Sequence, residues 1–283
     1  MRPISPVARS HSEPGAARSA AGEPRGPEVW TRVAPTYATT FARFTSLAIE
    51  PLLDQAGLTR GMKVFDLACG PGVAAAAALG RGATVCGADF SRGMVTLAHD
   101  AVPPGHFVQA DAHQLPWRAD GFDAVISNFG VHTFEKPLVA FGEVRRVLRP
   151  GGTFAFTVWD AVEHSEAERL LEQAVRMHGD GPPAAPKATE FADSARAGQV
   201  FTESGFTEFR TQPLDLRLRA RDGHEIFEIF RTGTIRLAKY LADQSPEALV
   251  VIREAYRKSL APWQDASGVR VPMRAVLHSA KRS

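Results

Sequence analysis

The sequence predicts an α/β protein built on a doubly wound, mostly parallel sheet. Short apolar runs alternate with helical patterns through the middle of the chain, the order that covers both faces of a parallel sheet with helices. One such run, at residues 63–67, leads into a glycine-rich turn at 68–72 and then an alanine-rich helical segment. Acidic residues stand near the ends of three successive runs, at Asp66, Asp89 and Asp111, about one βα unit apart.

Composition fits this fold and disfavours several function classes. The chain has 283 residues, 44% of them hydrophobic, which allows one large or two small domains with a substantial core. Its 33 basic and 31 acidic residues nearly cancel, so no overall field favours a polyanion, and we expect no nucleic-acid partner. No stretch approaches the roughly 20 consecutive apolar residues that span a bilayer. We therefore expect a cytoplasmic protein with no membrane partner.

The first 28 residues are rich in Pro, Gly, Ser, Ala and Arg, and we expect a disordered tail over residues 1–28. They hold no apolar run of the kind found in secretory signals, and an organellar transit peptide is the alternative interpretation. Because disulfides are rare in the cytoplasm, Cys69 and Cys86 are expected to stay reduced.

Residues 29–60 are expected to form two or three helices, because apolar residues recur every three or four positions and Pro35 and Pro51 interrupt the pattern. The core, residues 61–221, then begins with regular alternation. We predict strands near residues 63–67, 84–88, 106–110, 122–127 and 152–158. We predict helices near residues 72–80, 91–101 and 137–148, with Ser91 as an N-cap.

The second half of the chain predicts longer helical stretches. Helices are expected over residues 163–178 and 191–204, and a half-exposed strand is expected at 214–218, where leucines alternate with charged residues. Residues 222–262 form an insert with helical apolar stripes. This insert packs onto the core or covers a substrate as a cap, and both roles can hold for different residues.

Five sequence blocks in a fixed order make the pattern specific. They are residues 66–72 (DLACGPG), 87–94 (GADFSRGM), 109–117 (QADAHQLPW), 122–128 (FDAVISN) and 146–152 (RVLRPGG). Together they resemble the class I methyltransferases that depend on S-adenosylmethionine (SAM), in particular the branch similar to the ubiquinone and menaquinone C-methyltransferases. Ala68 departs from this family, in which many members have a glycine at that position.

The resemblance implies a Rossmann-like sheet of seven mostly parallel strands with an antiparallel last strand, which we place at residues 269–279 within the segment 263–283. It also implies that the helices of residues 29–60 and the insert at 222–262 together cover a substrate. The cofactor is then SAM and the product is S-adenosylhomocysteine (SAH).

The resemblance assigns contacts along the methionine and ribose parts of the cofactor. Asp66, with the turn residues Ala68, Gly70 and Gly72, would face the methionine amino group. Asp89 would accept hydrogen bonds from both ribose hydroxyls, since one carboxylate can take two.

The adenine end of the cofactor would lie along the next strand. Asp111 would accept a hydrogen bond from the exocyclic amine, and the backbone N–H of Ala112 would complete the adenine edge. Phe90 and Met94 would pack against the purine, with core packing as the alternative for both. The backbone carbonyl of Asn128 would hold the cofactor amine near the reacting sulfur.

Methyl transfer needs orientation more than covalent help, because the sulfonium is already a good leaving group. His132 is our candidate for a general base, since it follows Asn128 by four residues and histidine titrates in the useful range. Tyr37 is the second catalytic candidate, because it could close over the cofactor from the N-terminal helices. Ordinary packing is the alternative for both. His224 and Glu225 at the start of the insert either reach a substrate or form a solvated turn.

The sequence therefore predicts methyl transfer to a small, partly apolar and possibly aromatic acceptor, at carbon or oxygen, in specialised metabolism, by a monomer or homodimer. An enzyme that methylates amino groups of nucleic acids or proteins would carry Asn/Asp-Pro-Pro-aromatic after the fourth strand, where this chain has SNFG at 127–130. Three histidines have no metal-ligand spacing, so no metal is expected; they are His99, His106 and His113.

Two alternatives stay open. The first is a cyclase or SAM-binding module on the same scaffold, which would leave the methyl group on the cofactor. The second is an NAD(P)-dependent oxidoreductase, because residues 70–75 also fit a loose G-x-G-x-x-A pattern.

Overall fold

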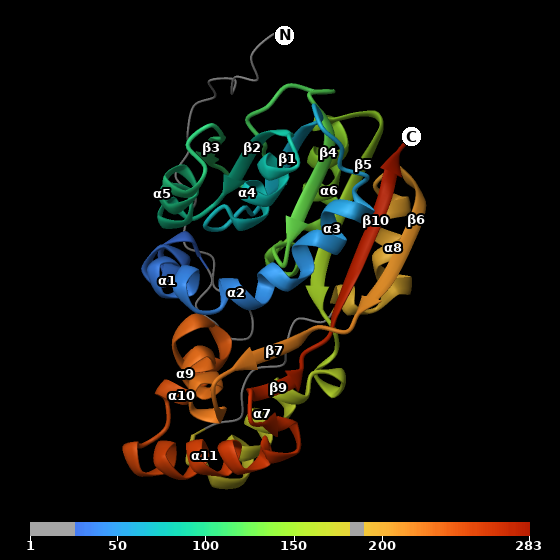
Figure 1. The fold of residues 1–283 in the computed structure, drawn as a ribbon. Helices are drawn as coiled ribbons and strands as arrows, with labels where there is room; N and C mark the ends of the chain where they lie inside the picture. The colour runs from blue at the N-terminus through green and yellow to red at the C-terminus, as the bar shows by residue number, and fades with distance from the viewer. Residues whose placement is uncertain (1–25, 182–189) are drawn as a thin grey trace.

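The computed structural model describes residues 26–181 and 190–283, which form two lobes (Figure 1). The upper lobe in the figure holds a large sheet between helices, and the lower lobe holds helices around a small sheet. The predicted tail at residues 1–28 lies almost wholly outside the described residues. Among the helices that the structure does describe, none combines the length and apolar character needed to cross a membrane.

The large sheet has seven strands in the order β3-β2-β1-β4-β5-β10-β6. These are β1 (Lys63–Leu67), β2 (Thr84–Asp89), β3 (His106–Gln109), β4 (Phe122–Asn128), β5 (Leu148–Trp159), β6 (Phe206–Leu214) and β10 (Ala275–Arg282). Strands β1 to β5 pair in parallel, and β10 runs antiparallel to both of its neighbours, β5 and β6. The predicted seven-stranded sheet with an antiparallel last strand is confirmed.

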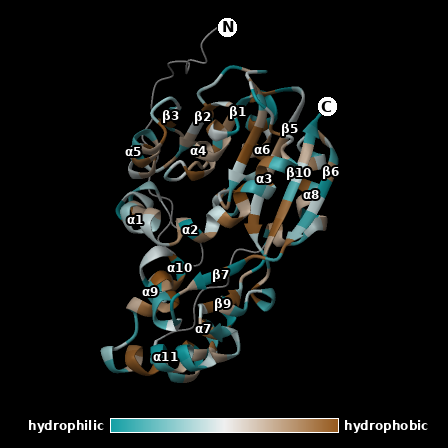
Figure 2. Cartoon of the chain, in the orientation of Figure 1, coloured by the Kyte–Doolittle hydropathy of each residue, from teal (hydrophilic) through white to brown (hydrophobic). Residues whose placement is uncertain are grey.

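Helices cover both faces of the large sheet. On one face these are α3 (Ile49–Gln55), α4 (Val73–Gly80) and α5 (Arg92–Ala101), and on the other α6 (Pro137–Val147) and α8 (Ser194–Glu203). Strand β4 shows the alternation behind this layering, because Ala124 and Ile126 pack with the first set and Val125 with the second. Figure 2 shows hydrophobic residues concentrated on the central strands of the large sheet.

The lower lobe has its own apolar core around a sheet of order β7-β9-β8. Its elements are α7 (Glu166–His178), β7 (Arg217–Ala220), α9 (Gly223–Gly233), α10 (Arg236–Ala242), α11 (Pro246–Ser259), β8 (Gln264–Asp265) and β9 (Gly268–Pro272). Short 3₁₀ helices complete the described chain. They are η1 (Ser46–Ala48), η2 (Val131–Thr133), η3 (Val162–His164), η4 (Glu190–Ala192) and η5 (Ala261–Trp263).

The strand predicted over 269–279 is divided between the two sheets, as β9 and β10. The chain leaves the small sheet at Pro272, which has no backbone N–H to continue a ladder. Next, the N–H of Met273 donates to the carbonyl of Leu216 at 2.9 Å, and the carbonyl of Arg274 accepts from the N–H of Asp160 at 3.0 Å. The strands that pair with them are divided in the same way, because β6 pairs with β10 in the large sheet and β7 pairs with β9 in the small sheet.

The N-terminal helices are α1 (Pro27–Thr39), α2 (Ala42–Thr45) and α3. The expected break at Pro35 is wrong, because α1 continues through it. Packing holds this helix, since Thr31 lies so close to α5 that a Cβ on Gly93 would be 2.9 Å from its carbonyl oxygen. Pro51 falls in the first turn of α3, where its missing N–H costs no helical bond.

Candidate active site

A cleft lies at the carboxyl ends of β1, β2 and β4, against the N-terminal helices. It encloses about 620 Å³, including the part open to solvent. Eight of the predicted site residues line it. These are Tyr37, Asp66, Ala68, Gly70, Asp89, Phe90, Met94 and Asn128. Ligand sites of doubly wound sheets occur at this edge, so the position agrees with the fold.

The turn after β1 brings the main chain to the floor of the cleft. Ala68 (φ 55°) and Gly70 (φ 53°) both adopt left-handed backbone, a conformation that favours glycine and that the Cβ of Ala68 disfavours. Gly72 (φ 84°) starts α4 but does not line the cleft. A Cβ on Gly72 would lie 3.0 Å from the Cα of Ala98, so this glycine lets α4 pack on α5. Its predicted cofactor contact stays a prediction.

Asp66 is the most unusual polar group of the cleft. The side chain is 1% exposed, and among the described residues neither carboxylate oxygen has a hydrogen-bond partner. Burial raises the pKa of Asp66 to about 8; the Ala75 backbone N–H opposes the rise without reaching hydrogen-bond geometry, and Asp89 adds to it. A buried carboxyl without a donor is costly, and a cation placed against it would remove that cost.

Asp89, at the end of β2, is held in place by main-chain donors. The Gly70 N–H donates to its Oδ2 and the Ser91 N–H to its Oδ1, both at 2.9 Å. Burial raises the pKa of Asp89 to about 6, although the N–H groups of Ser91 and Gly70 lower it. Each carboxylate oxygen keeps a second lone pair for a ligand hydroxyl.

The end of β4 is tied to two other elements. The Thr157 hydroxyl donates to Asn128 Oδ1 at 2.7 Å, and Asn128 Nδ2 donates to the carbonyl of Thr45 at 3.0 Å. Phe129 follows with left-handed backbone (φ 58°), and its ring stacks on Trp159 with centroids 4.0 Å apart. The cleft therefore has an aromatic wall beside a fixed amide.

Helix α1 supplies the facing wall. Trp30 and Tyr37 both line the cleft, and their rings meet edge to face with centroids 5.8 Å apart. The hydroxyls of Thr31 and Ser91 lie 3.0 Å apart and fasten α1 to the start of α5. Burial raises the pKa of the Tyr37 phenol, which therefore stays neutral near pH 7.

Besides Gly72, three predicted residues lie outside the cleft lining. Asp111 is exposed. Its Oδ1 accepts hydrogen bonds from the backbone N–H of His113 at 2.9 Å and from Nδ1 of the His113 imidazole at 2.5 Å. Ala112 is half-buried against the core beneath α6. His132 is half-buried in η2, between Gly130 and Thr133, which do line the cleft. The roles assigned to these three residues stay predictions.

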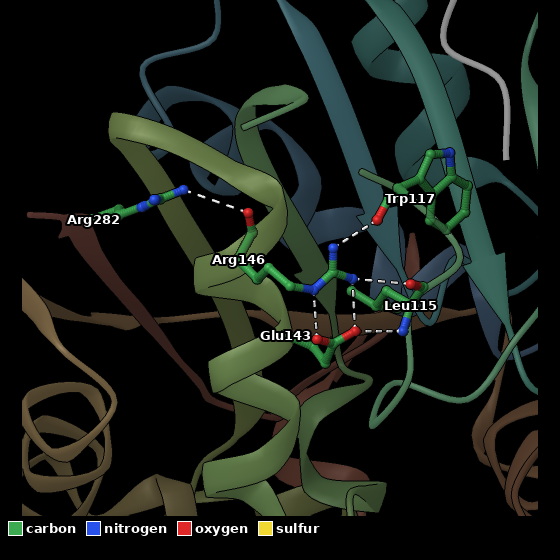
Figure 3. A network of polar contacts seen from close by, with 5 residues as sticks. All are labelled: Leu115, Trp117, Glu143, Arg146 and Arg282. Carbon is green, nitrogen blue, oxygen red and sulfur yellow. Dashed lines mark hydrogen bonds and ion pairs between the residues drawn. The ribbon is translucent and has the colours of Figure 1, made fainter. Parts of the chain in front are cut away.

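The loop that carries Asp111 is fastened to α6 by one arginine (Figure 3). Arg146 donates to the carbonyls of Trp117 at 2.7 Å and Leu115 at 3.0 Å, and it pairs with Glu143. Glu143 also accepts from the Leu115 N–H at 2.7 Å. These contacts fix the 115–117 segment between β3 and β4, and with it the predicted adenine side of the cleft.

Sequence reasoning missed several lining residues. Trp30 had a signal, because it precedes Tyr37 by two helical turns and so shares its face. Phe129 directly follows the predicted Asn128, but its positive φ and its stacking on Trp159 had no signal in the sequence. Thr45 is brought in by tertiary packing, and Gly130 follows Asn128 by two residues at the end of β4.

The polar groups of the cleft fit a ligand that carries both a cation and neighbouring hydroxyls. Asp66 offers an unsatisfied buried carboxyl, and Asp89 offers a carboxylate already positioned by two N–H donors. SAM has an amino group, a sulfonium and a ribose diol, so the residues present suit it.

Comparison with known proteins agrees with the motif blocks. Residues 65–156 match the methyltransferase domain family. A demethylmenaquinone methyltransferase of Clavibacter sepedonicus is 41% identical over 95 residues, covering 32% of this chain and 39% of that protein. One of Staphylococcus aureus strain MRSA252 is 36% identical over 102 residues, covering 34% and 42%. The chain thus spans about two fifths of the length of the curated relatives it matches.

Solved structures share the fold at low sequence identity. The YcgJ protein of Bacillus subtilis has a TM-score of 0.52 and 19% identity, covering 83% of this chain and 98% of its own. The (4+2) cyclase SpnF has a TM-score of 0.52 and 18% identity, covering 84% and 81%. The expected Rossmann-like architecture is confirmed.

Proposed function

We propose that this chain, whose residues 65–156 match the methyltransferase domain family, is a class I methyltransferase. It would move a methyl group from SAM to a small, partly apolar acceptor and release SAH. The aromatic walls of the cleft support an apolar and aromatic acceptor, because Trp30 and Tyr37 face the cleft from one side and Phe129 from another. Menaquinone precursors, the acceptors named for the relatives, belong to this chemical class.

The observation that carries the proposal is the unsatisfied carboxyl of Asp66 at the floor of the cleft. It would bind the cofactor amino group, and the second lone pairs of Asp89 would accept from the ribose hydroxyls. Bound SAM supplies a methyl group on a sulfonium, a leaving group that needs no proton. The chain's own tasks are then to orient the two reactants in line and to exclude water.

His132 would accept a proton from a hydroxyl or an acidic carbon of the acceptor, which is why we favour oxygen or carbon over nitrogen. A base in position contributes about 10²–10⁴-fold. His132→Ala should therefore lower turnover by about this factor and leave SAM affinity unchanged. Near-normal turnover would remove His132 from the mechanism.

Calorimetric titration with SAM and with SAH tests cofactor binding directly. Asp89→Ala should weaken SAM binding at least tenfold, because about 1.4 kcal/mol of lost hydrogen bonding corresponds to that factor. Asp100→Ala, which removes an exposed acid from α5, is the matched control and should change nothing. A well-folded protein that gives no heat with SAM would contradict the proposal.

A second measurement separates methyl transfer from binding alone. With SAM labelled on its methyl group, the label should appear in the acceptor when quinone-like and phenolic compounds are screened. A label that stays on the cofactor while the acceptor changes would instead favour the cyclase.

A further inference from the structure

A chain of hydrogen bonds runs from the sheet to the wall of the cleft. It begins at Thr157 on β5, passes through the Asn128 amide to the carbonyl of Thr45, and ends where the Tyr37 phenol lies 3.4 Å from Thr45 Oγ1. Tyr37, Thr45 and Asn128 come from three different elements, and all three line the cleft. Thr157 lies behind them and is fully buried.

The direction of each bond in this chain is fixed by its neighbours. Thr45 Oγ1 donates its only proton to the carbonyl of Ala42 at 3.0 Å, so the Tyr37 phenol must be the donor between the two hydroxyls. Thr157 Oγ1 donates to Asn128 and accepts from the Phe129 N–H at 3.1 Å. The Asn128 amide is therefore oriented, with its oxygen toward β5 and its nitrogen toward Thr45.

We infer that the side chains of Asn128 and Thr157 are positioning residues, which hold the turn at Thr45 and through it the Tyr37 ring over the cleft. The phenol proton points to Thr45, so the lone pairs of the phenol oxygen remain for a ligand donor. Tyr37 then acts by accepting a hydrogen bond and closing the cleft, and its raised pKa makes it a poor base near pH 7.

Helix α1 is held separately at its two ends. Its first half is fastened to α5 by Thr31, through Ser91 Oγ at 3.0 Å and the Gly93 N–H at 3.3 Å. Its second half is tied to the chain from Asn128 by the Tyr37 hydroxyl, and the Tyr37 ring contacts Phe41. It also packs on α9, where a Cβ on Gly233 would lie 2.6 Å from Thr40 Oγ1. Breaking the chain should therefore loosen residues 36–45 and leave residues 27–33 docked.

The test is hydrogen exchange of the cofactor-free protein, read at residues 36–45. Thr157→Val removes the hydroxyl at nearly constant volume and should speed exchange there at least tenfold, whereas Thr157→Ser keeps the hydroxyl and should stay near wild type. Gln55→Ala is the matched control, because it deletes another amide hydrogen bond of the N-terminal helices, to Ser279 Oγ at 2.8 Å, without touching this chain. Its exchange at 36–45 should be unchanged.

The rate of SAH dissociation links the hydrogen-bond chain to the cofactor. This second measurement rests on the proposed function. Asn128→Ala and Tyr37→Phe should both speed dissociation of SAH in stopped-flow measurements, and the double variant should be no faster than the single ones, because both act on one chain. Additive effects would overturn the inference, as would unchanged exchange at 36–45 in both Thr157→Val and Tyr37→Phe. Because exchange needs no ligand, failure of SAM binding would refute the proposed function and leave this test intact.

Discussion

Ala68 and Gly130 face each other across the floor of the cleft so closely that a Cβ on Gly130 would lie 2.5 Å from the Cβ of Ala68. Ser127 Oγ would be 2.8 Å from the same atom. Because Ala68 already carries a methyl group at this point of the turn, Gly130 must supply the space.

Gly130→Ala should therefore lower the free energy of unfolding by about 1–3 kcal/mol, the usual cost of overpacking a filled site. Adding Ala68→Gly should recover part of this loss, since one of the two colliding groups is gone. Urea denaturation measures both. Gly142→Ala on α6 is the control, because a Cβ there meets nothing within 4 Å, and it should not destabilise the protein. An equal loss with and without Ala68→Gly would show that Ala68 is not the obstacle.

Asp66 should make the cofactor-free protein less stable as the pH rises. Its folded pKa, about 8, is above the ordinary value of 3.8, so between these values the native state binds the proton that the unfolded state has released. Stability is then lost progressively from about pH 4 to pH 8. Asp66→Asn removes this loss and should raise the melting temperature more at pH 8 than at pH 5. Parallel pH profiles of the two proteins would contradict the raised pKa.

The same group should couple cofactor binding to proton release. A cationic amino group against Asp66 favours the carboxylate, so at pH 7 binding should expel a proton from a site that was mostly protonated. Calorimetry in buffers of different ionisation enthalpy counts the proton, and affinity should rise with pH up to about 8. Asp66→Asn should release no proton from this site. Binding without proton release in the unmodified chain would mean that the amino group lies elsewhere.

Arg146 should fix the 115–117 segment more than it stabilises the whole fold. Arg146→Leu leaves the carbonyls of Leu115 and Trp117 without their donor, so we expect a loss of about 1–3 kcal/mol and faster amide exchange over 110–121. SAM affinity should fall as well if Asp111 binds adenine. Arg231→Leu on α9 removes a half-exposed pair with Glu228 and should cost less than about 1 kcal/mol. Unchanged amide exchange over 110–121 would show that the loop keeps its conformation without Arg146.

Local patterns were enough to predict β1 to β5 and the helices between them, but not β6, because the strand expected at 214–218 spans the end of β6 and the start of β7. The runs that became β1, β2 and β4 are apolar, bounded by turns and almost entirely buried, and the Ser91 N-cap is confirmed by its bond from the Met94 N–H. What local patterns could not predict depends on distant contacts. Pro35 remains helical because Thr31 packs on Gly93, and the segment 269–279 divides because its neighbours on β6 and β7 belong to two sheets.

The candidate site shows the same limit. Asp66, Asp89 and Asn128 were predicted and do line the cleft, because they sit at strand ends whose position follows from the alternation. Asp111 stands at a comparable point after β3, yet its carboxylate caps its own turn at His113. Sequence spacing places such a residue at the correct edge but does not determine which way its side chain turns.

The place of β10 has a consequence for how this chain is made. Residues 275–282 form an inner strand between β5 and β6, although they leave the ribosome after both. Until residues 275–282 have been synthesised, β5 and β6 therefore lack the strand that pairs with both of them. Their unpaired edges are exposed to other chains during that time. Slow translation of the last stretch, or cleavage within it, would favour aggregation over completion of the sheet.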